Sequence, residues 1–300
     1  MFHRKPKPSP SSAQSAPPAS PKKKKKKKTK GRWTGVLLMV VFLVGLGVLL
    51  YPTVSDWWNS RVQSRAISDY SQAVSDLSKE DFDAIFVAAE DYNDRLRTTP
   101  LAFYEPEKVS GYQEALNING TGVMGYIDIP AIDVHIPIYH TTNESVLQIA
   151  VGHLEGSSLP IGGAGTHAVL SAHRGLPSAR LFTDLDKLKV GDTFTITVLN
   201  RVLTYQIDQI KIVLPTETED LLIANGQDYC TLMTCTPYGI NSHRMLLRGK
   251  RIETVEDAPI IVVRSEAEKI DPMTVIPLAA MPILFVLLLY LLIKYRKKKK

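Results

Sequence analysis

The chain has 300 residues, and its 36 Lys and Arg outnumber its 30 Asp and Glu, which gives a formal net charge of +6. The excess lies in the two ends, because residues 1–33 carry 12 Lys or Arg, residues 294–300 carry six, and neither end has an acidic residue. The middle of the chain therefore holds 36 − 18 = 18 basic residues against 30 acidic ones, a net charge of −12. An acidic central part is a poor binder of nucleic acid, so no nucleic-acid partner is expected.

The first 33 residues form a Pro-, Ser- and Lys-rich tail that we expect to be disordered and cytoplasmic. An uncharged, largely apolar segment follows at residues 34–51. At about 1.5 Å per residue it is long enough to cross the hydrocarbon core of a bilayer, and it predicts a transmembrane helix. A cleaved signal peptide is the alternative, but no small-x-small cleavage site follows the segment.

Residues 52–118 are predicted to form an extracellular helical region. Apolar residues recur every three or four positions from Asn59 to about Thr98, which is the spacing of an amphipathic helix. Ser78 and Asp81 are capping candidates, and they divide this stretch into two predicted helices.

The pattern changes after Asn119 to short β-branched runs that are bounded by Gly, Pro, Asn and Asp. Short helical interruptions are expected at residues 143–151 and 179–188. Seven or eight strands in so short a stretch predict a mainly β fold, with a closed or nearly closed antiparallel barrel over residues 119–255.

A charged linker at residues 256–274 leads to a second uncharged apolar segment, residues 275–293, and then to the basic tail at 294–300. A buried core helix is the alternative for the second segment, but the lysine block that follows favours another transmembrane helix. Since lysine clusters mark the cytoplasmic side, both termini are expected inside the cell and the domain between the two spans outside. The expected localisation is therefore the cell membrane, with two passes.

Cys230 and Cys235 are the only cysteines in the chain. Five positions along an extended strand cover about 16 Å, far beyond the ~7 Å at which two Cα atoms can be bridged. The odd spacing also places the two side chains on opposite faces of the strand. We expect Cys230 to be a small buried apolar residue and Cys235 to be a free thiol at the end of its strand.

Three residue types point to acyl transfer. Cys235 precedes a Pro-Tyr-Gly turn and Arg244 begins the returning strand, so a hairpin is predicted to bring them side by side. His173 ends another predicted strand, but its spacing alone does not place it beside the other two. A thiolate nucleophile, an imidazole that takes and returns its proton, and a guanidinium that binds an oxyanion would together make such a site.

Simpler roles exist for each of these residues. Arg244 alone could be a surface salt-bridge residue, and a lone histidine is more often structural than catalytic. No C-x-x-C or H-x-x-x-H spacing occurs near the cysteines, so neither a metal nor another cofactor is expected. The other histidines that compete for the role of the imidazole are His135, His140, His153, His167 and His243.

At these residues the sequence resembles a known family. TLMTCTP is similar to the TLxTC signature of sortases, the Gram-positive membrane transpeptidases, and SAHRG and NSHRMLLRG resemble their histidine and arginine motifs. The segment GYIDIPAIDVHIPIYH resembles class C, the pilus-assembling sortases. The resemblance as a whole covers about residues 60–255. It implies an eight-stranded sortase barrel preceded by helices, with Cys235 as nucleophile, His173 as general acid and base, and Arg244 aligning the substrate or stabilising the oxyanion.

The resemblance also implies partners and a reaction. In the family, the thiolate attacks the Thr–Gly bond of an LPxTG-like sorting signal on a pilin, and a lysine amine of the next pilin resolves the acyl-enzyme into an isopeptide bond. Pilins and the membrane are therefore the expected partners. Two alternatives stay open, namely a housekeeping-type sortase that anchors surface proteins to the cell-wall cross-bridge, and a non-catalytic membrane-tethered scaffold in which Cys235 is merely buried.

One departure from the class concerns a lid. Class C sortases usually carry an Asp-Pro-aromatic motif in a segment before the barrel that covers the site, and this chain has no such tripeptide between Thr98 and Asn119. The segment of about 99–111 occupies that region and offers Phe103 and Tyr104 to plug the groove. Because the aspartate is missing, the segment is interpreted equally well as a lid or as an ordinary linker loop.

Overall fold

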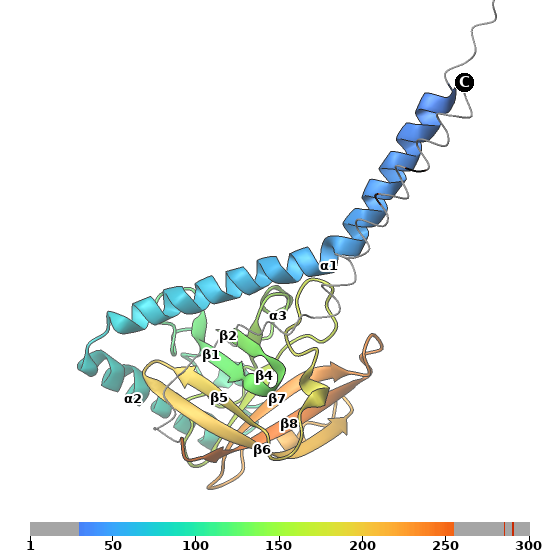
Figure 1. Cartoon of the computed structure of the whole chain (residues 1–300). Coiled ribbons are helices and arrows are strands. Elements are labelled where there is room, and N and C mark those ends of the chain that lie inside the picture. The colour runs from blue at the N-terminus through green and yellow to red at the C-terminus, as the bar shows by residue number, and fades with distance from the viewer. Residues whose placement is uncertain (1–29, 255–284, 286–289, 291–300) are drawn as a thin grey trace, which may run out of the picture.

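The computed structural model describes residues 30–254 together with Phe285 and Tyr290. Eight strands close into a barrel in the order β1-β2-β3-β4-β7-β8-β6-β5, and two long helices lie against it (Figure 1). The predicted linker at 256–274 and the predicted second span at 275–293 lie outside the described residues, apart from Phe285 and Tyr290. Most of the two basic tails lies outside them as well.

The barrel confirms the expected mainly β fold. Its strands are β1 Val123–Ile129, β2 Val134–His140, β3 Val151–His153, β4 Thr166–Ser171, β5 Thr193–Val198, β6 Arg201–Val213, β7 Asp228–Thr236 and β8 His243–Ile252. In most of the strands alternate residues point into one apolar core, as the pleat requires.

Three details of the barrel differ from the expectation. The pairs β2·β3 and β4·β7 are parallel, whereas an antiparallel barrel was expected. Within the stretch 143–151, expected to be helical, only α3, Glu144–Leu147, is an α-helix, and Val151 already begins β3. The second stretch, 179–188, holds only the single turn η3, Leu185–Lys187, because its apolar side chains pack into the core from an irregular loop.

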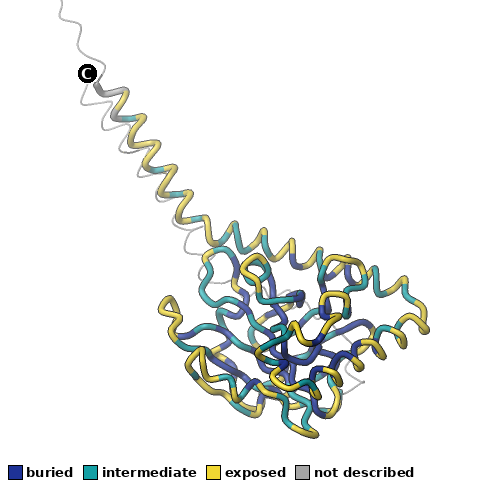
Figure 2. The backbone as a smooth tube through the Cα atoms, turned by 180° about the vertical axis from the view of Figure 1, so that it is seen from behind, coloured by how far each residue is buried: buried dark blue, intermediate teal, exposed yellow. Residues whose placement is uncertain are grey.

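The first helix, α1, runs without a break from Lys30 to Ser75. The predicted membrane segment and the predicted first extracellular helix are therefore one element, which bends as it meets the barrel (Figure 1). Pro52 lies within the helix, and proline is an ordinary cause of such a bend. The apolar part of α1 stands clear of the barrel with its side chains exposed (Figure 2), and it is long and apolar enough to cross a membrane.

The remainder of α1 binds the barrel through one polar face. Asp56, Asn59 and Gln63 follow one another at helical spacing, and each hydrogen bonds to a backbone group of a connection between strands. The partners are the amide of Arg180 at 2.8 Å, the carbonyl of Ser178 at 2.7 Å and the carbonyl of Ile149 at 2.7 Å, respectively. These contacts fix α1 against the β4–β5 connection and the segment before β3.

The second helix, α2, spans Lys79–Thr98 and begins with the predicted cap. The Ser78 side chain accepts a hydrogen bond from the Asp81 amide, and the Asp81 carboxylate accepts one from the Ser78 amide, which forms a complete capping box. The buried stripe of this helix packs onto the barrel core through Phe86, Ala89, Tyr92 and Leu96.

Tyr70 joins α1 to the barrel at a fully buried site. Its hydroxyl donates to the Met124 carbonyl at 3.0 Å and accepts from the Leu199 amide at 2.8 Å, so one oxygen satisfies groups of β1 and of the β5–β6 turn. Burial raises the pKa of this phenol to about 12, and the side chain is therefore neutral at physiological pH.

We predict that Tyr70→Phe destabilises the fold by about 1 to 3 kcal/mol, because it leaves a buried carbonyl and a buried amide without a partner. The free energy of unfolding of the full chain in detergent, measured by urea denaturation, checks this. Tyr104→Phe is the control, since Tyr104 is exposed and its hydroxyl meets the Thr218 hydroxyl, and a change within about 0.5 kcal/mol is expected. Equal midpoints for the two variants would contradict the role of Tyr70.

Candidate active site

Cys235 and Arg244 lie directly opposite each other across the antiparallel pair β7·β8. Residues paired in this way have Cβ atoms about 4.5–5.5 Å apart and project from the same face of the sheet. The hairpin predicted from the sequence is therefore present. Cys235 is partly exposed, at the point where β7 runs into its turn.

Cys230 points the other way, as its odd spacing from Cys235 predicts. Its side chain is 0% exposed and belongs to the barrel core. Burial raises the pKa of the Cys230 thiol well above its ordinary value, so this sulfur is held in the unreactive neutral form. Of the two cysteines, only Cys235 offers an accessible thiol.

His173 is placed beside Cys235 by the parallel pairing of β4 with β7. The register aligns Ser171 with Met233, and the Ala172 amide continues the ladder by donating to the Met233 carbonyl at 3.2 Å. Two residues beyond Ser171, His173 is level with Cys235 and on the same face. The Phe182 amide donates to the His173 carbonyl at 3.1 Å and so ties this residue to the β4–β5 connection.

Three neighbouring strand ends, of β4, β7 and β8, thus bring the predicted residues together at one rim of the barrel. Sequence reasoning placed Cys235 and Arg244 together but not His173. The missing information was the parallel pairing of β4 and β7, which the alternation of apolar residues in two strands does not reveal.

The guanidinium of Arg244 is turned toward the β7–β8 connection. Its Nη1 donates to the carbonyls of Asn241 and His243, both at 3.2 Å. Within the described part of the chain no carboxylate lies within ion-pair distance of Arg244. By contrast Arg248, which projects from the same face of β8, is paired with Asp208 at 2.9 Å. Among the described residues, Arg244 therefore has no partner for the salt-bridge role that was its simpler explanation.

The competing histidines have structural partners. His153 is completely buried between the Tyr112 hydroxyl and the Ser158 carbonyl, and burial lowers its pKa to about 4. His167 is likewise buried, and burial lowers its pKa as well. The remaining partners are the Gly122 and Ala115 carbonyls for His140, the Asp128 carboxylate for His135 and the Ser242 hydroxyl for His243.

The loop after His173 and the β7–β8 connection pack against each other. Gly175 has φ of +77°, and a Cβ at this position would lie 2.5 Å from Cε2 of Tyr238. Only glycine tolerates both the left-handed backbone and this contact. The Tyr238 ring, 60% exposed, therefore lies against Gly175 beside the candidate site.

Phe103 and Tyr104 lie over the outer face of the same sheet. Phe103 is half-buried against a small cluster formed by Val169 of β4, Leu246 of β8 and Leu221. Tyr104 meets the Thr218 hydroxyl at 2.9 Å, which ties the segment to the β6–β7 connection. A cavity of about 260 Å³ lies beneath this segment, and Phe103 and Tyr104 are among the residues that line it.

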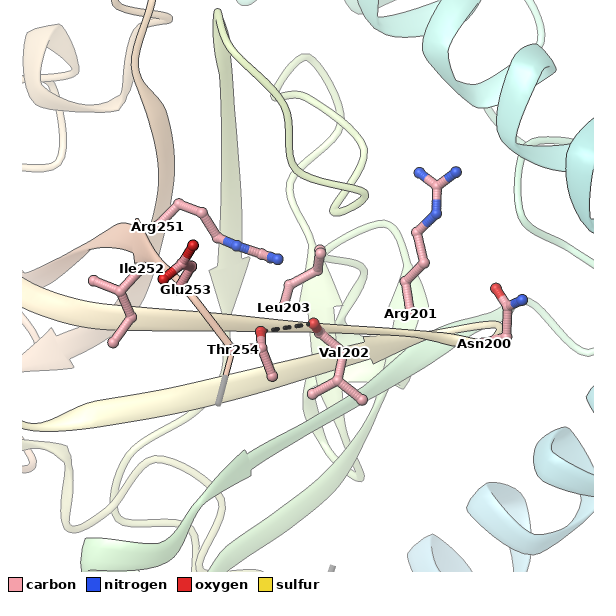
Figure 3. A pocket seen from close by; sticks show the side chains of 8 residues that line it. All are labelled: Asn200, Arg201, Val202, Leu203, Arg251, Ile252, Glu253 and Thr254. Atoms are coloured by element: carbon pink, nitrogen blue, oxygen red, sulfur yellow. Dashed lines mark hydrogen bonds between the residues drawn. The ribbon is translucent and has the colours of Figure 1, made fainter. Parts of the chain in front are cut away.

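A larger cavity, of about 560 Å³, lies at the other end of β8 (Figure 3). Arg251, which lines it, is seven residues beyond Arg244, about 23 Å along an extended strand. The residues that line this cavity include no cysteine or histidine. The rim that carries Cys235 is therefore the candidate active site. In the described residues no group of three His, Cys, Asp or Glu side chains is arranged to hold a metal ion.

Comparisons with known proteins identify the family. Residues 127–252 match the family described as Sortase domain. The crystal structure of sortase C1 from Streptococcus agalactiae is 50% identical, with a TM-score of 0.58, and the match covers 63% of this chain and 99% of that one. A structure of Clostridium perfringens sortase C with the C-terminal cell wall sorting motif is 42% identical, with a TM-score of 0.56. This match covers 64% of the present chain and 100% of the Clostridium perfringens chain.

A curated relative extends the comparison beyond pilus-type structures. Sortase D of Bacillus subtilis is 28% identical over 169 residues, which cover 52% of this chain and 82% of the relative. The eight-stranded barrel, the free thiol at its rim and these similarities agree with one another. The chain therefore belongs to the sortase family of cysteine transpeptidases, and within it to class C.

Proposed function

We propose that this protein is a membrane-anchored transpeptidase that cleaves an LPxTG-like sorting signal and joins the cleaved chain to a pilin lysine, thereby polymerising pili. The proposal rests on one observation. At one rim of the barrel, Cys235 of β7 lies opposite Arg244 of β8 and level with the position of His173 after β4, and all three are on the same face. The similarity to a sortase C structure that contains a sorting motif supports the class of substrate.

In the proposed reaction Cys235 is the nucleophile. Its thiolate attacks the carbonyl carbon of the Thr–Gly bond, and the Arg244 guanidinium stabilises the negative charge that develops on the oxygen. The C–N bond then breaks as the His173 imidazolium gives its proton to the departing glycine amine. A thioester between Cys235 and the threonine carbonyl remains.

The second half of the reaction transfers the acyl group. A lysine amine of another pilin attacks the thioester, His173 takes the proton that this amine loses, and Cys235 leaves as the thiolate. The product is an isopeptide bond, and the enzyme returns to its starting state. A cell-wall amine would use the same three groups, so the acceptor amine is what separates pilus polymerisation from surface-protein anchoring.

The membrane supplies the location of this reaction. The exposed apolar part of α1 is the first proposed anchor, and residues 275–293 are the second. The lysine clusters beyond each anchor favour a cytoplasmic position for both termini and an extracellular position for the barrel. Pilins that are held at the outer surface would then meet the rim of the barrel close to the membrane.

The segment of about 99–111 is proposed to act as a lid. Phe103 and Tyr104 hold it across the outer face of β4 and β8 without the aspartate that is usual in the class. The packing of Phe103 and the hydroxyl contact of Tyr104 act together with Ala102 and Val109, which are buried in the core.

We expect Cys235→Ala to abolish pilin ladders, a loss of at least about a thousandfold in rate, because no other side chain at the rim can form the thioester. The measurement uses the full chain in vesicles with a pilin that carries an LPxTG-like tail, followed by electrophoresis. Cys230→Ala is the control and should retain ladders. Persistent ladders in Cys235→Ala would contradict the mechanism, and single anchored bands from the unaltered enzyme would favour cell-wall anchoring.

For the lid, we predict that Phe103→Ala speeds alkylation of Cys235 by a bulky maleimide about five- to thirtyfold. The loss of roughly 1 to 2 kcal/mol of apolar burial raises the open population by that factor. Leu101→Ala, in the same segment but with a side chain already 59% exposed, should alkylate at nearly the unaltered rate. If Phe103→Ala reacts no faster than Leu101→Ala, the segment is a linker and not a lid.

A further inference from the structure

The ring of His173 has one nitrogen that is buried and lacks a hydrogen bond. Nε2 is closed off from solvent, and no group in the described residues is in hydrogen-bonding geometry with it. Its nearest charged neighbour is the carboxylate of Glu144, whose Oε1 lies 3.4 Å away. A buried ring nitrogen without a partner is costly in a folded protein, and a facing carboxylate reduces that cost when the ring is protonated.

Glu144 reaches the histidine from a separate part of the fold. It is the first residue of α3, in the connection from β2 to β3, whereas His173 follows β4. Gln148 donates from Nε2 to Glu144 Oε1 at 2.5 Å and so fixes the carboxylate. The neighbouring Ile149 carbonyl accepts a hydrogen bond from Gln63 of α1, which ties the end of this connection to α1.

The carboxylate is an anion at any pH at which the enzyme would work. The Gln148 amide, and after it the charge of His173, hold the pKa of Glu144 below its ordinary value. The other charged or titratable groups around His173 are Cys235 of β7 and Arg244 of β8, together with Arg174, which is itself paired with Asp186. Asp186 is thus already paired with an arginine. Glu144 faces the His173 ring, and in the described residues no Lys or Arg forms an ion pair with it.

We propose that Glu144 is a positioning residue that holds the imidazole of His173 with Nε2 toward α3 and leaves Nδ1 for proton exchange with Cys235. The carboxylate also stabilises the imidazolium that gives its proton to the leaving amine. This inference rests on the proposed role of His173 and deepens it. The proposal gives a function to the β2–β3 connection, a segment that carries none of the three proposed catalytic residues.

The direct test is NMR of the His173 ring nitrogens in full-length Cys235→Ala with labelled histidine, assigned with a His173→Gln variant. Glu144→Gln should move the Nε2 resonance of His173, because this nitrogen loses the carboxylate that faces it. Glu144→Asp keeps the charge and should recover at least half of that change. Glu80→Gln, an exposed residue in the first turn of α2, is the matched control with no expected change.

The same substitutions in the enzyme with Cys235 intact complete the test. Glu144→Gln should slow pilin ladder formation on the order of tenfold, since general acid catalysis depends on the orientation and charge of the imidazole. An unchanged Nε2 resonance of His173 in Glu144→Gln, or a changed resonance with an unchanged rate, would overturn the proposal. The resonance is measured without the nucleophile, so this failure is distinct from failure of the cysteine mechanism.

Discussion

β7 is the middle strand of the three that carry the proposed catalytic groups, and its parallel pairing with β4 is the constraint on which the site depends. The antiparallel β7–β8 hairpin sets Arg244 against Cys235 through local chain geometry. The position of His173 follows instead from a register between strands that are about sixty residues apart in the sequence. A slip of one residue in that register would turn the imidazole to the opposite face of the sheet.

From outside the sheet, α1 contacts the two connections next to the proposed site. The polar face of this helix contacts the loop that follows His173, through the backbone of Ser178 and Arg180, and also the end of the segment that carries Glu144, at Ile149. Both connections therefore rest on one rigid element. Because α1 continues into the proposed membrane anchor without a break, the helix that tethers the barrel also supports the loops around His173.

Much of this arrangement is local and was predictable from the sequence. The Ser78–Asp81 cap, the opposite faces of Cys230 and Cys235 and the β7–β8 hairpin all follow from spacing of a few residues. The parallel pairs, the three-residue strand β3 and the contact of Glu144 with His173 were missed. Each of these features depends on the pairing of segments that are far apart in the sequence. Short apolar runs give little information on which distant segment a strand will pair with. The continuity of α1 was missed because the membrane segment and the first extracellular helix were predicted as separate elements, whereas one helix runs through both.

The most direct measurement is the modification of full-length enzyme by a sorting-signal peptide whose scissile bond is replaced with an electrophile, mapped by mass spectrometry. The account predicts that the label is confined to Cys235, and that its rate falls at least about tenfold in both His173→Ala and Arg244→Lys. The buried thiol of Cys230 should stay unmodified. Equal labelling of the two cysteines, or an unchanged rate in both variants, would show that the three groups at the rim do not act together.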